Sequence, residues 1–534
     1  MGMEVELKLS ASARALRDLE ELPWLRKIAA RTGRRHNLIS VYFDTPRAKF
    51  ARHGVTLRIR RDGAQRIQTI KADPKRMSSP SAGRSFAAAP FARPEWEAPV
   101  PSDQPVLSLA EGTALAPLLG RKTAERLKPV FETRIRRTTI LVPQGTSVIE
   151  LAIDRGSIRA GGQSMRVSEV ELELKSGDPR AILELAARLA RRCPLRYAPL
   201  SKAERGYALA YRIAAAAGGR ASGTRRTAGA VRAVGAAAVT LDRRASAAEA
   251  LQSIGFSCLR HLALNEDRVH EGDPEAIHQM RVGLRRLQAA IACFKDLLGD
   301  AQSGRIQSEC RWLRERLGPA RDLDVLVRQG LAPFKTGAAR RRELAGLRRR
   351  LETQRRAELS LAGDAVRSER YRRFVLAVAL WLAGGGWSTR RGPAAALRAQ
   401  PVVEFARQVL DHRARKLRKG VRRLDRLSDD RRHAVRIAAK KLRYGSEFFA
   451  SLFSQPRRDA QRRRYLAVLK TLQDGLGRLN DLAVQGRIAR ALPPREAAAA
   501  LELLAERGAV DLAPLLAAAV QAAARLERAP EFWK

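Results

Sequence analysis

Apolar and polar residues alternate along the first 210 residues, in short segments separated by turn residues. Alternation with a period of two places apolar side chains on one face of a strand and polar ones on the other. The pattern predicts strands at residues 3–9, 38–43, 56–60, 67–71, 131–142, 147–154 and 167–175. Helical spacing predicts helices over about 12–30 and 179–193, and residues 73–94, rich in Pro, Ser and Ala, are expected to form a loop.

The second half has a different pattern. Residues 241–534 repeat their apolar positions every three or four residues, which is typical of amphipathic helices. Residues 211–240 hold mainly Ala, Gly, Arg and Thr without periodicity, as linkers do. We therefore predict an α+β multidomain protein of 534 residues, with a strand-rich domain at 1–210, a flexible linker at 211–240 and a helical domain at 241–534.

The net charge of the chain limits the classes of function that it can have. The chain has 102 Lys and Arg against 55 Asp and Glu, a formal net charge of +47, and 45% hydrophobic residues. This combination argues against a disordered basic tail and favours a folded protein that binds polyanions. Aromatic residues make up only 5%, which counts against nucleic-acid binding by base stacking, although nucleic acid remains an alternative partner.

The sequence shows no signal peptide, and its longest apolar stretch, residues 375–387, is too short to span a bilayer. The four cysteines lack the spacing of a metal site, so they are expected to be buried thiols in a reducing compartment. We therefore expect a cytoplasmic protein that does not associate with membranes.

Charged residues gather on one face of the predicted strands. Glu4, Glu6 and Lys8 share a face of the first strand. The same alternation recurs at Arg58 and Arg60, at Lys71, at Asp154 and at Glu169, Glu171 and Glu173. One such strand is explained by a solvated sheet face, but segregated acids and cations on several strands favour an acidic and a basic wall around one site. Carboxylates suit Mg²⁺ or Mn²⁺, and Arg and Lys suit phosphate oxygens, so the pattern predicts a site for a metal-bound oligophosphate.

Ordered blocks along residues 1–210, from Glu4-x-Glu6-x-Lys8 to Leu200-Ser201-Lys202, resemble the CYTH family, the triphosphate tunnel metalloenzymes. The resemblance implies an eight-stranded antiparallel β tunnel barrel with flanking helices, which hydrolyses inorganic triphosphate with Mg²⁺ or Mn²⁺. It implies metal ligands at Glu4, Glu6, Asp154, Glu171 and Glu173, and phosphate-binding catalytic cations at Lys8, Arg58, Arg60, Lys71, Arg137 and Lys202. Two choices stay open: Arg134 and Arg136 compete with Arg137, and Glu169 lies one step from the chosen glutamate pair.

The helical half contains a motif of His and basic residues twice, 155 residues apart. The first copy is His278, Arg281, Arg285 and Arg286, and the second is His433, Arg436, Lys440 and Lys441. Offsets of three and seven residues place the His and two cations on one helical face. A solvated basic face is the ordinary explanation for such a helix, but repetition in register favours anion binding by both copies.

These repeats resemble the CHAD family, which implies two pseudo-symmetric four-helix bundles that bind inorganic polyphosphate through the eight repeated residues. Asp322 and Asp481, in a second repeated block, are expected to orient these cations or to cap helices. The sequence therefore predicts a metal-dependent inorganic triphosphatase joined to a polyphosphate-binding domain, associated with polyphosphate granules. A non-catalytic polyphosphate-binding scaffold is the alternative.

Overall fold

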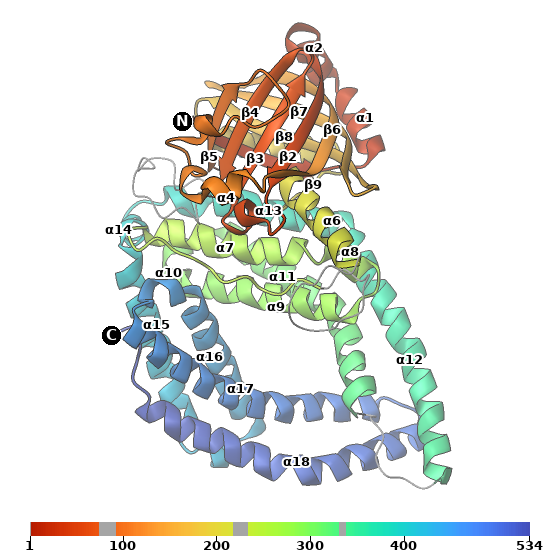
Figure 1. Ribbon diagram of the computed structural model, residues 1–534. Helices are drawn as coiled ribbons and strands as arrows, with labels where there is room; N and C mark the ends of the chain where they lie inside the picture. Colours follow the sequence, from red (N-terminus) through yellow and green to blue (C-terminus); the bar gives the residue numbers. More distant parts are fainter. Residues whose placement is uncertain (1, 74–91, 217–232, 331–337) are drawn as a thin grey trace. The chain divides into compact units, whose positions relative to one another are not determined.

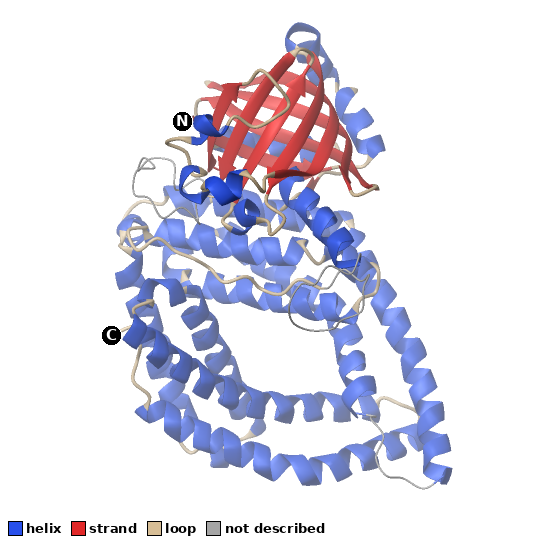
Figure 2. Cartoon of the chain, in the orientation of Figure 1, coloured by secondary structure: helices blue, strands red, loops and turns tan. Residues whose placement is uncertain are grey.

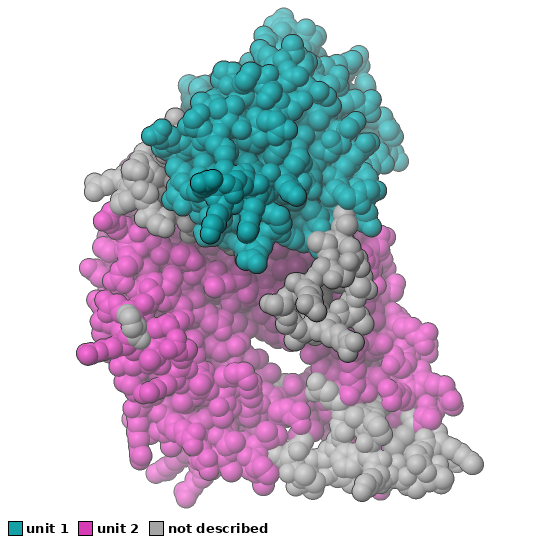
Figure 3. All heavy atoms as spheres, viewed as in Figure 1, with its two compact units in different colours: residues 1–232, 375–384 teal, residues 233–374, 385–534 magenta. Residues whose placement is uncertain are grey.

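The computed structural model describes residues 2–73, 92–216, 233–330 and 338–534. The chain divides into two compact units (Figure 3): unit 1 comprises residues 1–232 and 375–384, and unit 2 comprises residues 233–374 and 385–534. Figure 2 shows strands and helices in unit 1 and helices throughout the described part of unit 2. The predicted order, a sheet with flanking helices followed by a helical half, is confirmed.

In the described part of unit 1, nine antiparallel strands form one sheet (Figure 1), where eight were predicted. They are β1 (Gly2–Ser10), β2 (Arg34–Asp44), β3 (Val55–Asp62), β4 (Gln65–Ala72), β5 (Ala92–Pro99), β6 (Lys128–Gln144), β7 (Ser147–Ala160), β8 (Gln163–Ser176) and β9 (Arg196–Tyr197). Their order is β5-β4-β3-β2-β6-β7-β8-β1-β9. The additional strand, β9, has two residues and pairs with β1, which also pairs with β5.

Two predicted boundaries differ from the structure. The loop predicted at 73–94 overlaps β5 at its first residues, while residues 74–91 lie outside the described part of the chain. The predicted linker begins too early, because helix α6 (Lys202–Ala216) runs into it; residues 217–232 of that linker are also outside the described part.

Helices cover the apolar face of the sheet. They include α1 (Ala13–Glu20), α2 (Pro23–Thr32) and α5 (Arg180–Ala190). Leu16 of α1 and Leu185 of α5 share a buried cluster with Leu7, Leu151 and Leu172 of the strands. Because these apolar side chains alternate with the charged ones, burying them under helices leaves the charged residues on the opposite face.

The single helix predicted over 12–30 is two helices. Ser12 begins α1, and its hydroxyl accepts a hydrogen bond from the amide of Ala15 at 3.1 Å. Pro23 then occupies the first turn of α2. Proline has no amide hydrogen and disfavours helical geometry in the residue before it, so the chain ends one helix and starts another there.

Helix α6 packs against β6 and β7 at one end of the opposite, partly charged face. Its Tyr207 and Leu209 belong to a buried cluster with Tyr42, Phe131 and Ile158. The Phe131 ring stacks on Tyr42 at a centroid distance of 4.4 Å and meets Tyr207 edge-on at 5.1 Å. This apolar contact positions the start of α6, and with it Lys202, beside the charged residues.

Replacing Gly206 of α6 by Ala should destabilise unit 1. A Cβ at this position would lie 2.1 Å from Cε2 of Phe131, whose ring is held between two tyrosines. Such overpacking costs about 1–3 kcal/mol, so the thermal unfolding transition of unit 1 should fall by several degrees.

The matched control is Gly304→Ala in the exposed face of a helix of unit 2, where an added Cβ meets nothing within 4 Å. There the better helix propensity of alanine should leave the melting temperature unchanged or raise it slightly. Equal effects of both substitutions would contradict this account of the α6 contact.

The described part of unit 2 consists mainly of α-helices of 4 to 35 residues. They are α7 (Ala247–Ala263), α8 (Glu266–His270), α9 (Pro274–Cys293), α10 (Lys295–Leu298), α11 (Ala301–Val325), α12 (Ala338–Arg367), the first residues of α13 (Glu369–Gly384), α14 (Pro393–Ala399), α15 (Val402–Val421), α16 (Asp429–Phe448), α17 (Pro456–Arg490) and α18 (Pro494–Arg528). Asp273 caps α9 by accepting hydrogen bonds from the amides of Glu275 and Ala276. The two predicted motifs lie on α9 and α16, which pack against each other. Among the described residues, no helix is long and apolar enough to cross a membrane.

Candidate functional site

Strand pairing collects the charged residues of unit 1 on one face. Lys8 of β1 lies opposite Glu171 of β8, and Glu169 of β8 lies opposite Asp154 of β7. Arg137 of β6 lies opposite Asp154 on the other side. Directly opposed residues point to the same side of a sheet, so these five residues from four neighbouring strands converge.

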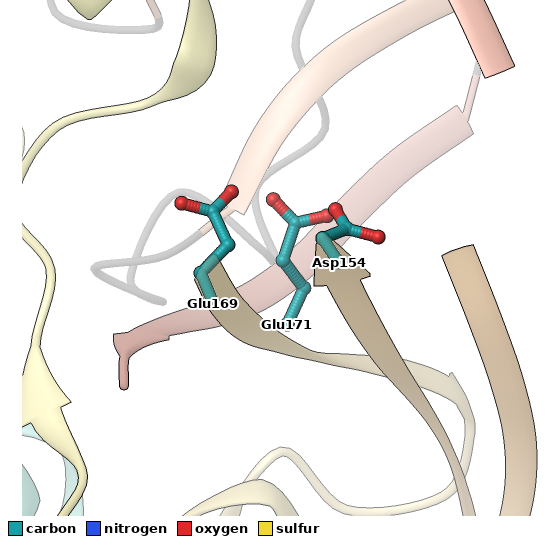
Figure 4. Close-up of side chains that lie close together, drawn as sticks. All are labelled: Asp154, Glu169 and Glu171. Atoms are coloured by element: carbon teal, nitrogen blue, oxygen red, sulfur yellow. The ribbon is translucent and has the colours of Figure 1, made fainter. Parts of the chain in front are cut away.

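Three carboxylates form the centre of this face (Figure 4). Oxygens of Asp154, Glu169 and Glu171 lie within 4.8 Å of one another. The three residues are 0%, 1% and 8% exposed. Buried carboxylates at this spacing require compensating positive charge, which side chains or a bound cation can supply.

Side-chain cations provide that charge here. Arg137 donates two hydrogen bonds to Asp154, both 2.7 Å long, and also pairs with Glu171. The ammonium of Lys202 lies 2.6 Å from Asp154 and 2.9 Å from Glu171, and it pairs with Glu169 as well. Although burial opposes ionisation, these cations together with Lys8 lower the pKa of Glu171 well below its ordinary value. The pKa of Asp154 is lowered in the same way, by the charges of Lys202 and Arg137 and by a hydrogen bond from Arg137.

The predicted metal ligands are only partly brought together. Asp154 and Glu171 belong to the carboxylate cluster, and Glu6 lies beside it, with its carboxylate 2.5 Å from Lys8. Glu173 is 27% exposed and pairs with Lys175 at 2.8 Å. Glu169, two residues before Glu171 on the same face of β8, completes the cluster instead, because Lys202 of α6 pairs with it there. The backbone of Glu4 lies in β1; its side chain is outside the described part of the structure.

Glu169 contacts Arg205, a residue that the sequence did not single out. Arg205, one turn after Lys202 on α6, forms an ion pair with Glu169. Both Lys202 and Arg205 therefore contact the carboxylates from α6, whereas the other partners come from strands. The only sequence signal for Arg205 is its position in the block that follows Lys202.

The predicted phosphate-binding cations continue along the same face. Lys71 of β4 pairs with Glu95 of β5 at 3.1 Å, and Arg58 of β3 lies 3.8 Å from the same carboxylate. Tyr42 accepts a long hydrogen bond of 3.4 Å from Arg58. Burial opposes its ionisation, but Arg58, Arg60 and Lys71 lower the pKa of Tyr42, which shows how strongly positive this region is.

Arg60 is the least compensated of these cations. Within the described residues it has no carboxylate at ion-pairing distance, and its Nε donates to the Ser40 hydroxyl at 3.5 Å. Burial and the charges of Arg58 and Arg137 lower the pKa of Arg60 to about 10. A guanidinium held beside two others without an acid is suited to bind an anion.

The structure also separates the three candidate arginines of β6. Arg137 contacts the carboxylate cluster, whereas Arg134 and Arg136 are exposed on the other face. Arg134 pairs with Glu132 at 2.7 Å. Strand alternation explains the difference, because Arg134 and Arg136 lie three and one residues from Arg137 and so point to the opposite face.

Unit 2 holds a second charged group, which we call the inter-repeat cluster. It comprises His278, Arg281 and Arg285 of α9, Arg314, Arg321 and Asp322 of α11, Arg436 and Lys440 of α16, and Asp481 and Arg487 of α17. Arg281 lies 3.7 Å from Asp322, as expected if this acid orients the cation. Sequence reasoning did not single out Arg314 or Arg487 as ligand contacts, because neither belongs to a repeated motif.

Several guanidinium nitrogens of this cluster lack hydrogen-bond acceptors in the described part of the chain. Nη1 of Arg281, Nε of Arg285 and Nε of Arg436 are buried, yet none has a hydrogen-bond acceptor among the described residues. Arg285 and Lys440 also have no carboxylate within ion-pairing distance in the described part of the chain. Buried donors without acceptors are costly, so this arrangement is suited to an anionic ligand.

Two of the eight predicted polyphosphate ligands lie elsewhere. Arg286 is 5% exposed and donates to Glu447 of α16 at 2.8 Å. Lys441 is exposed on the side of α16 that faces Arg413. His433 is exposed near the start of that helix and stays a predicted ligand. Adjacent helical residues point about 100° apart, so the second basic residue of each pair leaves the face that carries the first.

Comparisons with known proteins divide the chain into the same two parts, a strand-rich one and a helical one. A family model for the CYTH domain matches residues 2–207, and one for the CHAD domain matches residues 253–490. An inorganic triphosphatase of Haemophilus influenzae is 30% identical over 210 residues, which cover 39% of this chain and 55% of that protein. The chain thus spans about half the length of this first curated relative. An uncharacterized protein of Mycobacterium tuberculosis is 28% identical over 434 residues, covering 76% of this chain and 75% of that protein.

Two solved structures are also similar. The CHAD domain from the plant Ricinus communis is 32% identical and covers 56% of this chain and 99% of its own, with a TM-score of 0.49. A Hippeastrum protein described as a putative adenylyl cyclase with a dominant triphosphatase activity is 18% identical and covers 39% of this chain and 96% of its own, with a TM-score of 0.28. From the two family matches, the chain is a CYTH–CHAD protein, with a CYTH domain followed by a CHAD domain.

Proposed function

We propose that unit 1 hydrolyses inorganic triphosphate on its charged face, and that unit 2 binds polyphosphate. The observation that carries the first part is the group of three buried carboxylates within 4.8 Å, set beside cations on the same face of one sheet. The inorganic triphosphatase of Haemophilus influenzae supports it, because the match of 210 residues is about as long as the CYTH region at residues 2–207.

The carboxylate cluster fits a divalent cation. Its members offer hard oxygen ligands from Asp154, Glu169 and Glu171, with Glu6 nearby on β1, and these suit Mg²⁺ or Mn²⁺. Glu4 remains a predicted further ligand. When bound, the cation would neutralise phosphate charge and polarise the terminal phosphorus.

The cations of the face bind and orient the substrate. Arg60, with no carboxylate partner, and Arg137, beside the acids, would hold phosphate oxygens between the basic and acidic parts. Lys8 and Lys202 would exchange their present carboxylate partners for phosphate oxygens as the divalent cation takes those carboxylates. Arg58 and Lys71 would turn from Glu95 to phosphate oxygens. Binding substrate and cation together therefore keeps the buried charges compensated.

The reaction needs positioning and charge stabilisation more than covalent chemistry. A water oxygen attacks the terminal phosphorus, the bond to the bridging oxygen breaks, and phosphate, diphosphate and a proton are released. Arg60 and Arg137 stabilise charge on the transferred and leaving groups. For this chemistry we propose that β1–β8 act as the wall of a tunnel, which the β1–β5 pairing favours.

The test is phosphate release by the full chain from inorganic triphosphate, with ATP and thiamine triphosphate beside it. We expect turnover of the inorganic substrate with Mg²⁺ or Mn²⁺, abolished by chelation and restored by the metal. No metal-dependent release from any of the three would overturn the enzyme and favour the non-catalytic scaffold. A preference for ATP would indicate that unit 1 hydrolyses nucleotides instead.

For unit 2, the inter-repeat cluster supports polyphosphate binding. Unpaired guanidinium nitrogens from both repeats face the same cluster, and successive phosphates could satisfy them. Binding by many such contacts should weaken steeply with salt. At fixed salt, polyphosphate should displace bound RNA; the reverse preference would favour a nucleic-acid-binding protein.

A further inference from the structure

Lys440 occupies an unusual position within the inter-repeat cluster. Lys440 lies one turn after Arg436 on α16, and α16 packs against α9, the helix that carries Arg285. The charges of both arginines act on its ammonium. None of the described residues gives it an ion-pair partner, unlike Lys202 in unit 1. A lysine in such a place can relieve the repulsion by releasing its proton, which an arginine cannot do near neutral pH.

The elements packed against α16 present few acids to Lys440. Asp481 of α17 is the acid that acts most strongly on it, and Arg443 of α16 adds a further positive charge. On α15, Arg413 and Lys416 act on Lys441, on another side of the helix. The short turn at Ala450–Phe453 carries no charged residue. The surroundings of Lys440 are therefore strongly positive until an anion arrives.

We propose that polyphosphate binding to the inter-repeat cluster is coupled to proton uptake by Lys440, so that affinity rises as the pH falls from 9 to 7. This inference rests on the polyphosphate binding proposed above and adds its regulation. Phosphate oxygens beside the ammonium stabilise its charged form, and thermodynamic linkage requires the charged form to bind the phosphates more tightly.

The direction and size of the pH effect on affinity follow from the pKa of Lys440 in the free protein. Burial and the charges of Arg436 and Arg285 lower the pKa of Lys440 to about 7. If bound polyphosphate restores an ordinary value near 10.4, affinity should fall roughly 30-fold or more between pH 7 and pH 9, with uptake of about 0.9 proton per chain at pH 8. His278, whose pKa burial and Arg321 lower to about 4, stays neutral in the free protein over this range.

The experiment titrates the full chain with long-chain polyphosphate, whose internal phosphates stay ionised from pH 7 to pH 9. Calorimetry in two buffers of different ionisation enthalpy gives both the affinity and the number of protons taken up. K440R keeps a permanent charge and K440Q has none, so both should lose the proton uptake and the pH dependence. K441R, outside the cluster, should keep the wild-type pH dependence.

The outcomes separate this inference from the function it rests on. Wild-type binding with a flat pH profile, or a K440R profile as steep as the wild type, would overturn proton coupling and leave polyphosphate binding intact. No binding at any pH would overturn the proposed function of unit 2 and this inference with it. If K440R fails to fold, K440Q gives the same comparison, with weak binding at every pH expected.

Discussion

Replacing Glu171 by Gln should reduce hydrolysis of inorganic triphosphate by about 10³-fold or more, while unit 1 stays folded. Glu171 contacts Lys8, Arg137 and Lys202 and belongs to the only carboxylate group of this kind in the described part of the chain. Glutamine keeps the shape and can still accept from the lysines, but it removes the charge that would hold a divalent cation. Steady-state phosphate release measures the effect, and thermal unfolding checks the fold.

The matched control is Glu173→Gln, two residues along the same strand and on the same face. Glu173 is 27% exposed and pairs with Lys175, away from the cluster. Its substitution should change turnover by less than about threefold, since exposed ion pairs contribute little. If Glu173→Gln were as inactive as Glu171→Gln, the glutamate pair implied by the sequence resemblance would be correct and the observed cluster would not define the site.

Replacing Arg285 and Arg436 together by Gln should weaken polyphosphate binding by about 10²-fold or more, because each charge-assisted hydrogen bond contributes about 1.5–3 kcal/mol. The two residues come from different repeats and carry buried nitrogens without acceptors in the described structure. The salt dependence of binding should become shallower as well. Without ligand, the double variant should unfold at a higher temperature, because it removes repulsion among buried cations.

Lys441→Gln serves as the control for this prediction. It removes a positive charge from the same helix, but Lys441 lies outside the inter-repeat cluster. We expect its affinity to fall by less than about threefold through the weaker general field. Equal losses for Lys441→Gln and a single Arg285→Gln would indicate diffuse binding to basic helices and contradict a defined site.

Strand alternation was enough to predict the charged face of unit 1. The parity of Glu6, Lys8, Arg58 and Glu171 assigned them to one side, and the pairing in the structure agrees. Alternation could not show which two of the three glutamates on β8 belong to the cluster, since all three have the same parity. That choice depends on where α6 places Lys202 and Arg205, which is a tertiary contact.

Strand β5 shows another limit of the pattern. Its segment contains Pro94 and follows residues rich in Pro, Ser and Ala, which favour a loop. The strand forms because β1 and β4 pair with its two sides. Pairing partners distant in sequence can override local preference, and no local signal reports them.

In unit 2 the repeat identified the two correct helices but not the full set of side chains. Arg285 and Lys440 lie in the cluster, whereas their neighbours Arg286 and Lys441 do not, although each pair looks alike in sequence. Arg286 instead joins the repeats through Glu447. Arg314 and Arg487 could not be predicted, because only the packing of α11 and α17 brings them to the motifs.

The central claim is that triphosphate binds on the charged face of unit 1, between the carboxylate cluster and Arg60. The most direct measurement is a crystal structure of the full chain with Mn²⁺ and a non-hydrolysable triphosphate analogue, using anomalous scattering to locate the metal. We predict an anomalous peak ligated by Asp154, Glu169 or Glu171, with phosphate oxygens on Arg60 and Arg137. A metal and analogue bound away from these residues, or no ordered analogue on this face, would contradict the account.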